Sequence, residues 1–204
     1  ALAALGMGAA ATPARGRVGG LGGGGGGCGG GGGGVGDGVR VGDVVVALDY
    51  VQHDMDVSPL FQRWHVPGYA GVRLPCDAGL SAHLSGAVSA CLQSAGGQFY
   101  VNSDGRPPQL HRGLVASGDQ FVTSAQVSRA LRDPLVAAGH DVLAVEMEGA
   151  AVAQVCLDYG VPFAAVRTIS DRADDDAHVD FPVFIQTVAS RYADHIVRHL
   201  LESL

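Results

Sequence analysis

Polar residues follow apolar runs at three places in the chain. The phrases are SGDQFV at 117–122, VEMEGA at 145–150 and RTISD at 167–171. A carboxyl group in such a phrase can act as a general acid if burial or neighbouring negative charge raises its pKa. On the residues alone, an aspartate that ends a strand, such as Asp171, is more often a helix cap or a solvated loop residue. Both interpretations of Asp171 are open at this point.

The three phrases end predicted strands of an α/β fold. Strands alternate with helices, which predicts three layers: a mixed, mostly parallel sheet flanked by helices. In such sheets the working residues lie at the carboxyl ends of strands. The predicted strands are 41–48, 111–117, 141–146 and 161–169. The predicted helices are 81–95, 123–138, 148–159 and a last one through Phe184, Val188, Tyr192, Ile196 and Leu200. Pro134 should break or restart the second helix, and Gly160 should cap the third.

A glycine-rich tract separates the N-terminus from the rest of the chain. Residues 19–34 are nearly all glycine, and glycine loses more backbone entropy on ordering than any other residue. The tract is therefore not expected to form a core strand. We predict a low-complexity, disordered segment at 1–34 and a partial domain at 35–204, with a sheet that is incomplete at its N-terminal side.

Composition excludes several classes of function. The formal net charge is −7, all 13 basic residues are arginine, and no basic run is present, which argues against nucleic acid as a partner. No apolar run approaches the ~18 residues of a membrane span. The four cysteines lie far apart, so reduced thiols in a cytoplasmic protein are expected. We expect no cofactor and no metal site, since His195 and His199 lack a third ligand and Asp174, Asp175 and Asp176 lack the spacing of a calcium loop.

Five phrases together resemble a known family. They are VGDVVV at 41–46, QHDMD at 52–56, VEMEGAAVAQVC at 145–156, VPFAAVRTISD at 161–171 and ISDRADDDAHVDF at 169–181. In order and spacing they resemble the nucleoside phosphorylase superfamily, and most of all its methylthioadenosine/S-adenosylhomocysteine nucleosidase branch. The resemblance runs from about Val35 to the C-terminus. It implies a homodimeric hydrolase that releases adenine from these two nucleosides, in methionine salvage and nucleoside catabolism.

The resemblance also implies a role for each candidate site residue. Breaking an N-glycosidic bond through a ribosyl cation requires an acid for the leaving purine and an anion near the sugar. By analogy Asp171 protonates purine N7, and Ser170 orients it. The remaining implied contacts are Met147 and Glu148 with the ribose, Phe121 and Val122 with adenine, Arg167 near the attacking water or phosphate, and Phe181 as an aromatic that closes over the substrate.

Other polar residues have weaker assignments. Glu146 is a candidate substrate ligand, with a structural role as the favoured alternative because the family gives the sugar contact to Glu148. Asp119 is interpreted as a loop or interface group. His53, Asp54 and Asp56 lie in a segment that, in the family, is near the subunit contact and the 5′-substituent pocket.

One departure from the family bears on activity. In the family a glutamate near the N-terminus activates the attacking water, and this chain has no glutamate before Glu146. A general base contributes about 10² to 10⁴ in rate, so low turnover is expected. Two alternatives stay open: a phosphorylase or other nucleosidase of the same superfamily, and a non-catalytic nucleoside-binding remnant.

Overall fold

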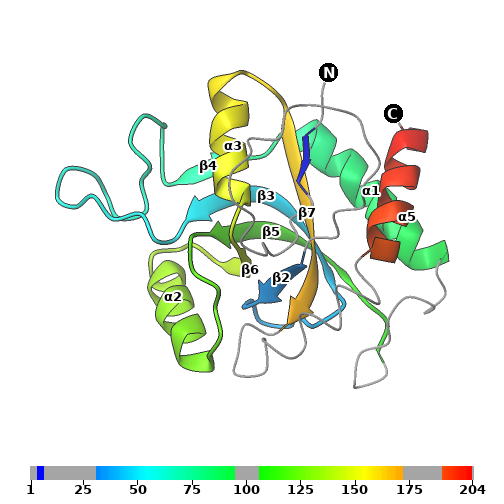
Figure 1. Cartoon of the computed structure of the whole chain (residues 1–204), viewed down its shortest axis with the longest axis horizontal. Helices are drawn as coiled ribbons and strands as arrows, with labels where there is room; N and C mark the ends of the chain where they lie inside the picture. Colours follow the sequence, from blue (N-terminus) through cyan, green and yellow to red (C-terminus); the bar gives the residue numbers. More distant parts are fainter. Residues whose placement is uncertain (1–3, 7–30, 95–105, 172–189, 204) are drawn as a thin grey trace, which may run out of the picture.

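The computed structural model describes residues 4–6, 31–94, 106–171 and 190–203 (Figure 1). Its strands are β1 Ala4–Gly6, β2 Gly31–Gly34, β3 Val44–Gln52, β4 Arg73–Pro75, β5 Leu110–Ser117, β6 Val142–Glu146 and β7 Phe163–Asp171. Its helices are α1 Ala78–Ser94, α2 Ala125–Ala137, α3 Gly149–Asp158 and α5 Ser190–Ser203. Each strand and helix expected after residue 40 is therefore present; the predicted start of the last helix, at Phe184 and Val188, lies outside the described residues.

The strands form one mixed sheet in the order β1-β7-β2-β6-β5-β3-β4, with a further pairing between β7 and β3. β5 runs parallel to both β3 and β6. β7 runs antiparallel to β3 and parallel to β1 and β2. The carboxyl end of β7 therefore points the opposite way from those of β3, β5 and β6.

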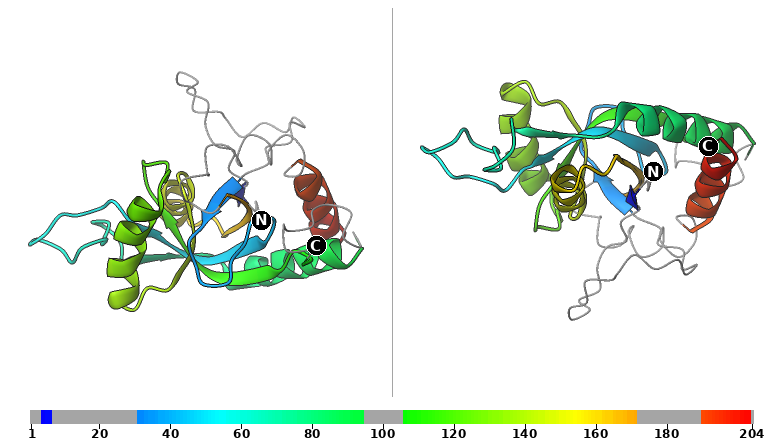
Figure 2. Two further views of the ribbon diagram at one scale, coloured as in Figure 1. Left: turned by 90° about the horizontal axis from the view of Figure 1, so that it is seen from below. Right: turned by 90° about the horizontal axis from the view of Figure 1, so that it is seen from above.

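Helices cover both faces of this sheet, as the alternation of buried residues along the strands requires. Val44 and Val46 of β3 pack with α1 and α5, whereas Val45 and Ala47 face α3. Leu135 of α2 packs with Leu114 and Ala116 of β5 and with Val142 and Val145 of β6 in a third cluster. Figure 2 shows α1 and α2 on one side of the sheet and α3 on the other. The three-layer α/β prediction is confirmed.

The expectation that the glycine tract stays out of the core sheet is wrong for its last four residues. Gly31–Gly34 lies between β7 and β6, parallel to the first and antiparallel to the second. Backbone donors and acceptors make these ladders, so no side chain is needed. At Gly34 a Cβ would lie 3.1 Å from Ile169 Cγ2 and 3.3 Å from Val39 Cγ1, so neighbouring side chains already fill that space.

Two local predictions about helix ends have different outcomes. Gly160 has φ +62°, and the bond from Val161 N–H to the Cys156 carbonyl, 2.8 Å, closes the end of α3 as expected. Pro134 does not break α2, which continues to Ala137. Its ring removes only its own N–H, and its carbonyl still accepts from Ala138 N–H at 3.1 Å.

Candidate functional site

The ends of β5 and β6 lie side by side and meet the start of α3. Ser117 and Glu146 are register partners and the last residues of their strands. Ser117 Oγ accepts from the Ala150 N–H at 3.1 Å, in the first turn of α3. The short turn of Met147 and Glu148 between β6 and α3 is thereby fixed at both of its ends.

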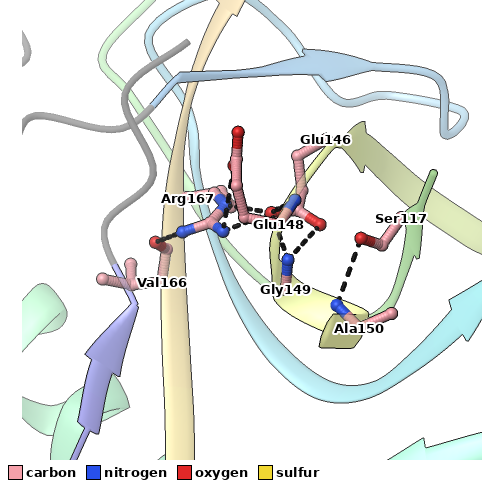
Figure 3. A network of polar contacts seen from close by, with 7 residues as sticks. All are labelled: Ser117, Glu146, Glu148, Gly149, Ala150, Val166 and Arg167. Carbon is pink, nitrogen blue, oxygen red and sulfur yellow. Dashed lines mark hydrogen bonds and ion pairs between the residues drawn. The ribbon is translucent and has the colours of Figure 1, made fainter. Parts of the chain in front are cut away.

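A buried ion pair lies under this turn (Figure 3). Arg167 Nε donates to Glu146 Oε2 at 3.0 Å, and Nη2 donates to the same oxygen. The Gly149 N–H also donates to the Glu146 carboxylate, at 2.9 Å, and the Glu148 N–H does so at 3.3 Å. Both side chains of the pair are 1% exposed. The contacts of Glu146 support the structural alternative, because protein groups already occupy its carboxylate.

Arg167 reaches this pair from the middle of β7. Its odd-numbered neighbours Phe163, Ala165 and Ile169 belong to the cluster that packs on α3, so Arg167 projects toward the same side. Burial opposes the guanidinium charge, but the surrounding negative groups outweigh burial and raise the pKa of Arg167. Arg167 is therefore a permanent cation inside the fold.

Glu148 is the more accessible of the two carboxylates in the turn. Its side chain is 39% exposed, and Oε2 lies 3.9 Å from Arg167 Nη2. Burial, followed by the charge of Glu146, raises the pKa of Glu148. Met147 beside it is half-buried. Met147 and Glu148, which are expected to contact a sugar, thus lie above the buried ion pair of Arg167 and Glu146.

Ser170 and Asp171 form a second polar pair, at the end of β7. Ser170 Oγ donates to Asp171 Oδ2 at 2.8 Å, and both residues are buried. The ladder with β2 shifts register here, from Gly32 opposite Ile169 to Gly33 opposite Asp171, which leaves Ser170 as an extra residue. Such a bulge re-aims the side chains next to it.

The three phrases do not all lie at the same edge of the sheet. Ser117 and Glu146 lie at one edge, but β7 runs the other way, so its middle residue Arg167 meets Glu146. Gly33 lies between the ends of β6 and β7, because it pairs with Val145 on one side and with Asp171 on the other. Strand direction depends on tertiary connections that no short phrase encodes.

The remaining candidate residues lie around this centre. Phe121 is exposed and Val122 is buried in the cluster that contains α2. The Asp119 N–H donates to Asp54 Oδ2 at 2.8 Å, which brings the 52–56 and 117–122 phrases together. Phe181 lies outside the described residues, as do Asp174, Asp175 and Asp176.

Two residues near the site carry polar atoms that the sequence phrases do not explain. Within the described ranges, Tyr50 Oη and His53 Nε2 are buried without a hydrogen-bond partner. Burial lowers the pKa of His53 and raises that of Tyr50. Tyr50 was not among the candidates predicted from the sequence, because a tyrosine between Asp49 and Val51 of a strand carries no distinct signal.

The described residues hold no group of three or more His, Cys, Asp or Glu side chains that could bind a metal. His199 Nδ1 lies 3.6 Å from Glu202 Oε2. No helix in the described part of the chain is long and apolar enough to span a bilayer.

Comparison with known proteins identifies the family. A sequence model of the phosphorylase superfamily matches residues 29–202. The chain belongs to the phosphorylase superfamily. Two curated superfamily members with similar sequences are 5′-methylthioadenosine/S-adenosylhomocysteine nucleosidases. The one from Exiguobacterium sp. is 36% identical over 163 residues, and the one from Geobacillus thermodenitrificans is 33% identical over 162 residues. These alignments cover 78% and 79% of this chain, and the chain spans 61% of the length of each relative.

Solved structures of the superfamily agree with the fold. A nucleosidase from Neisseria meningitidis in complex with methylthio-immucillin-A matches with TM-score 0.69 and 32% identity, over 85% of this chain and 67% of that one. A nucleosidase from Colwellia psychrerythraea in complex with adenine matches with TM-score 0.71 and 26% identity, over 85% and 64%. The resemblance inferred from the sequence phrases is confirmed at the level of family and fold.

Proposed function

We propose that this chain binds 5′-methylthioadenosine and S-adenosylhomocysteine and hydrolyses their N-glycosidic bond to release adenine. The named activities of the curated relatives and the ligands of the solved structures support this substrate class. The observation that carries the proposal is the buried Ser170–Asp171 pair at the end of β7.

Asp171 is the acid in this proposal. A purine leaves as an anion unless N7 is protonated, so a carboxyl group that delivers a proton lowers the barrier. The Ser170 hydroxyl holds Oδ2 at 2.8 Å and so fixes the orientation of the carboxyl group. A fixed donor needs less reorganisation at the moment of bond cleavage.

Met147 and Glu148 form the sugar contact. Ribose hydroxyls can donate to the Glu148 carboxylate, whose negative charge also favours a developing ribosyl cation. The pair of Glu146 and Arg167 supports this turn through the N–H groups of Glu148 and Gly149. We assign Arg167 and Glu146 to positioning of the turn, with adenine stacked on Phe121 beside the backbone of Val122.

A second candidate is a nucleoside-binding protein without turnover. It is favoured by one feature of the given residues, since none of residues 1–145 is a glutamate that could serve as general base. Loss of a general base lowers the rate by about 10² to 10⁴, but it leaves the acid and the sugar contact in place. The two candidates therefore share a binding site and differ only in adenine release.

Asp171→Asn tests the role of the acid. The asparagine keeps the size of the side chain but cannot donate a carboxyl proton. We expect adenine release, followed by chromatography, to fall at least 10²-fold while the affinity for 5′-methylthio-7-deazaadenosine stays within a few fold. This ligand carries carbon in place of N7 and so resists cleavage by the same route.

Asp194→Asn is the matched control, because Asp194 lies on the exposed face of α5. Undiminished release in Asp171→Asn would refute the assignment of the acid. Release that requires inorganic phosphate would identify a phosphorylase instead. Saturable binding with no release in the unmodified chain would establish the second candidate.

We also propose a cytoplasmic homodimer. Exposed apolar side chains in the loop after β3 support the dimer, since Leu60 is 84% exposed and Phe61 lies next to it. The described cysteines Cys76, Cys91 and Cys156 are free thiols, as in a reducing compartment. Sedimentation equilibrium measures the mass of the assembly, and a monomer at micromolar concentration would refute the dimer.

A further inference from the structure

Tyr50 projects from β3 to the underside of the turn that carries Met147 and Glu148. It is fully buried and belongs to the cluster formed by β3, β6, β7 and α3. Its ring also lies 6.0 Å from that of Phe163, centroid to centroid. The ring therefore has packed neighbours on several sides and little room to move.

The phenol rests directly on Gly149. A Cβ atom placed on Gly149 would overlap Tyr50 Cε1 and Cζ and would lie 2.7 Å from Oη. Real side chains do not tolerate such contacts, so either the ring or the turn would have to shift. Because the ring is enclosed, the turn would be displaced. Tyr50 and Gly149 are thus complementary in size.

The backbone of Gly149 also anchors the Met147–Glu148 turn through hydrogen bonds. Its N–H donates to both Glu146 oxygens, and the preceding residue is Glu148. Any displacement of the Gly149 backbone therefore moves the carboxylate that, in the proposed function, binds the sugar. A mispositioning of even about 1 Å can weaken such a contact substantially.

We propose that Tyr50 is a positioning residue, whose ring, seated against the side-chain-free surface of Gly149, sets the position of the Met147–Glu148 turn for ribose binding. The inference rests on the proposed function, because the assignment of the sugar contact to Glu148 does. Its hydroxyl is not required for this role, since Oη has no hydrogen-bond partner among the described residues. The shape of the ring is what matters.

The test compares two ligands of the full chain by calorimetry. They are 5′-methylthio-7-deazaadenosine and its 2′,3′-dideoxy counterpart, and the readout is the dissociation constant of the dideoxy ligand divided by that of the ligand with both sugar hydroxyls. General loss of stability lowers the binding-competent fraction equally for both ligands, so the ratio stays constant. A displaced Glu148 weakens only the ligand that carries sugar hydroxyls.

In Gly149→Ala we expect the ratio to fall about tenfold, equivalent to about 1.4 kcal/mol. Tyr50→Phe keeps the ring and should leave the ratio unchanged. Tyr50→Val combined with Gly149→Ala replaces the ring by a smaller side chain, so the ratio should return to within about threefold of the unmodified chain. Gly86→Ala is the control, because a Cβ at that position of α1 would meet no atom within 4 Å apart from the neighbouring backbone of its own helix.

An unchanged ratio in folded Gly149→Ala would overturn the inference. If that variant does not fold, Tyr50→Val decides, because an unchanged ratio after loss of the ring would overturn it equally. If the unmodified chain does not distinguish the two ligands, the sugar contact of the proposed function fails, and the inference fails with it. The unmodified chain and the variants thus separate the two failures.

Discussion

Glu146→Gln should destabilise the fold strongly, although it replaces only one oxygen of the carboxylate by an NH₂ group. Glutamine keeps the size of the side chain and one acceptor oxygen, but it loses the negative charge. Its amide NH₂ would face donors, since Arg167 and the Gly149 and Glu148 N–H groups surround the carboxylate. The remaining oxygen can take the Oε2 position that all of these donors contact, so the loss is the negative charge opposite Arg167 and the gain is an NH₂ group at Oε1 that faces the Gly149 N–H.

The size of the effect follows from the burial of this pair. Removal of one partner of a buried ion pair costs about 3–5 kcal/mol. Glu148 Oε2 lies 3.9 Å from Arg167 Nη2 and retains part of the compensation, so we expect the lower limit, about 3 kcal/mol. In a chain of this length each kcal/mol lowers Tm by about 2–4 °C, which predicts a decrease of about 6–12 °C.

Urea unfolding followed by circular dichroism measures this loss. Asp194→Asn is the control, because it breaks an exposed ion pair with Arg198 and should leave the midpoint nearly unchanged. The double variant Glu146→Leu with Arg167→Met removes both charges and should be less destabilised than Glu146→Gln. A free energy of unfolding of Glu146→Gln within about 1 kcal/mol of the unmodified chain would refute the reasoning.

Two further predictions concern the pH dependence of stability and the start of α2. Burial and the charge of Glu146 raise the pKa of Glu148. The folded chain therefore binds the proton of the Glu148 carboxyl group more tightly than the unfolded chain does. As a result, the free energy of unfolding should fall as pH rises from about 4.5 through the folded-state pKa. Glu148→Gln should remove that slope in urea midpoints measured between about pH 4 and pH 7; a slope that persists would assign it to another group. Ser124 Oγ accepts from the Val127 N–H at 3.2 Å at the start of α2, so Ser124→Ala should cost about 1 kcal/mol in urea unfolding, whereas Ser124→Asp should restore the cap. Equal midpoints for the alanine and aspartate variants would contradict the capping role.

Much of the fold could be predicted from local patterns. Short apolar runs predicted β3 and β6, and the four-residue spacing of apolar residues predicted α5. Gly160 was correctly predicted to end α3, because a left-handed residue is a local requirement. The family was also predicted correctly, since VEMEGA and RTISD are contiguous phrases.

The candidate site was less predictable. Ser170 and Asp171 are neighbours in sequence, so their pairing needed no tertiary information. The bonds from Arg167 to Glu146 join residues 21 positions apart, and they depend on the reversed direction of β7. The contact between the Tyr50 ring and Gly149 depends on the packing of β3 against α3. Neither residue alone predicts this contact.

What the sequence by itself determined is thus the type and order of the elements and the phrases that name the superfamily. Only the tertiary structure decided that the glycines at 31–34 form a central strand and that β7 runs in the opposite direction to β6. It also decided that Glu146 holds the Met147–Glu148 turn. The physical reason is that periodicity records which face of an element is buried. Strand direction, register and close contacts depend instead on which distant segment packs against that face. This pairing is determined by the fold of the whole chain and not by any local pattern.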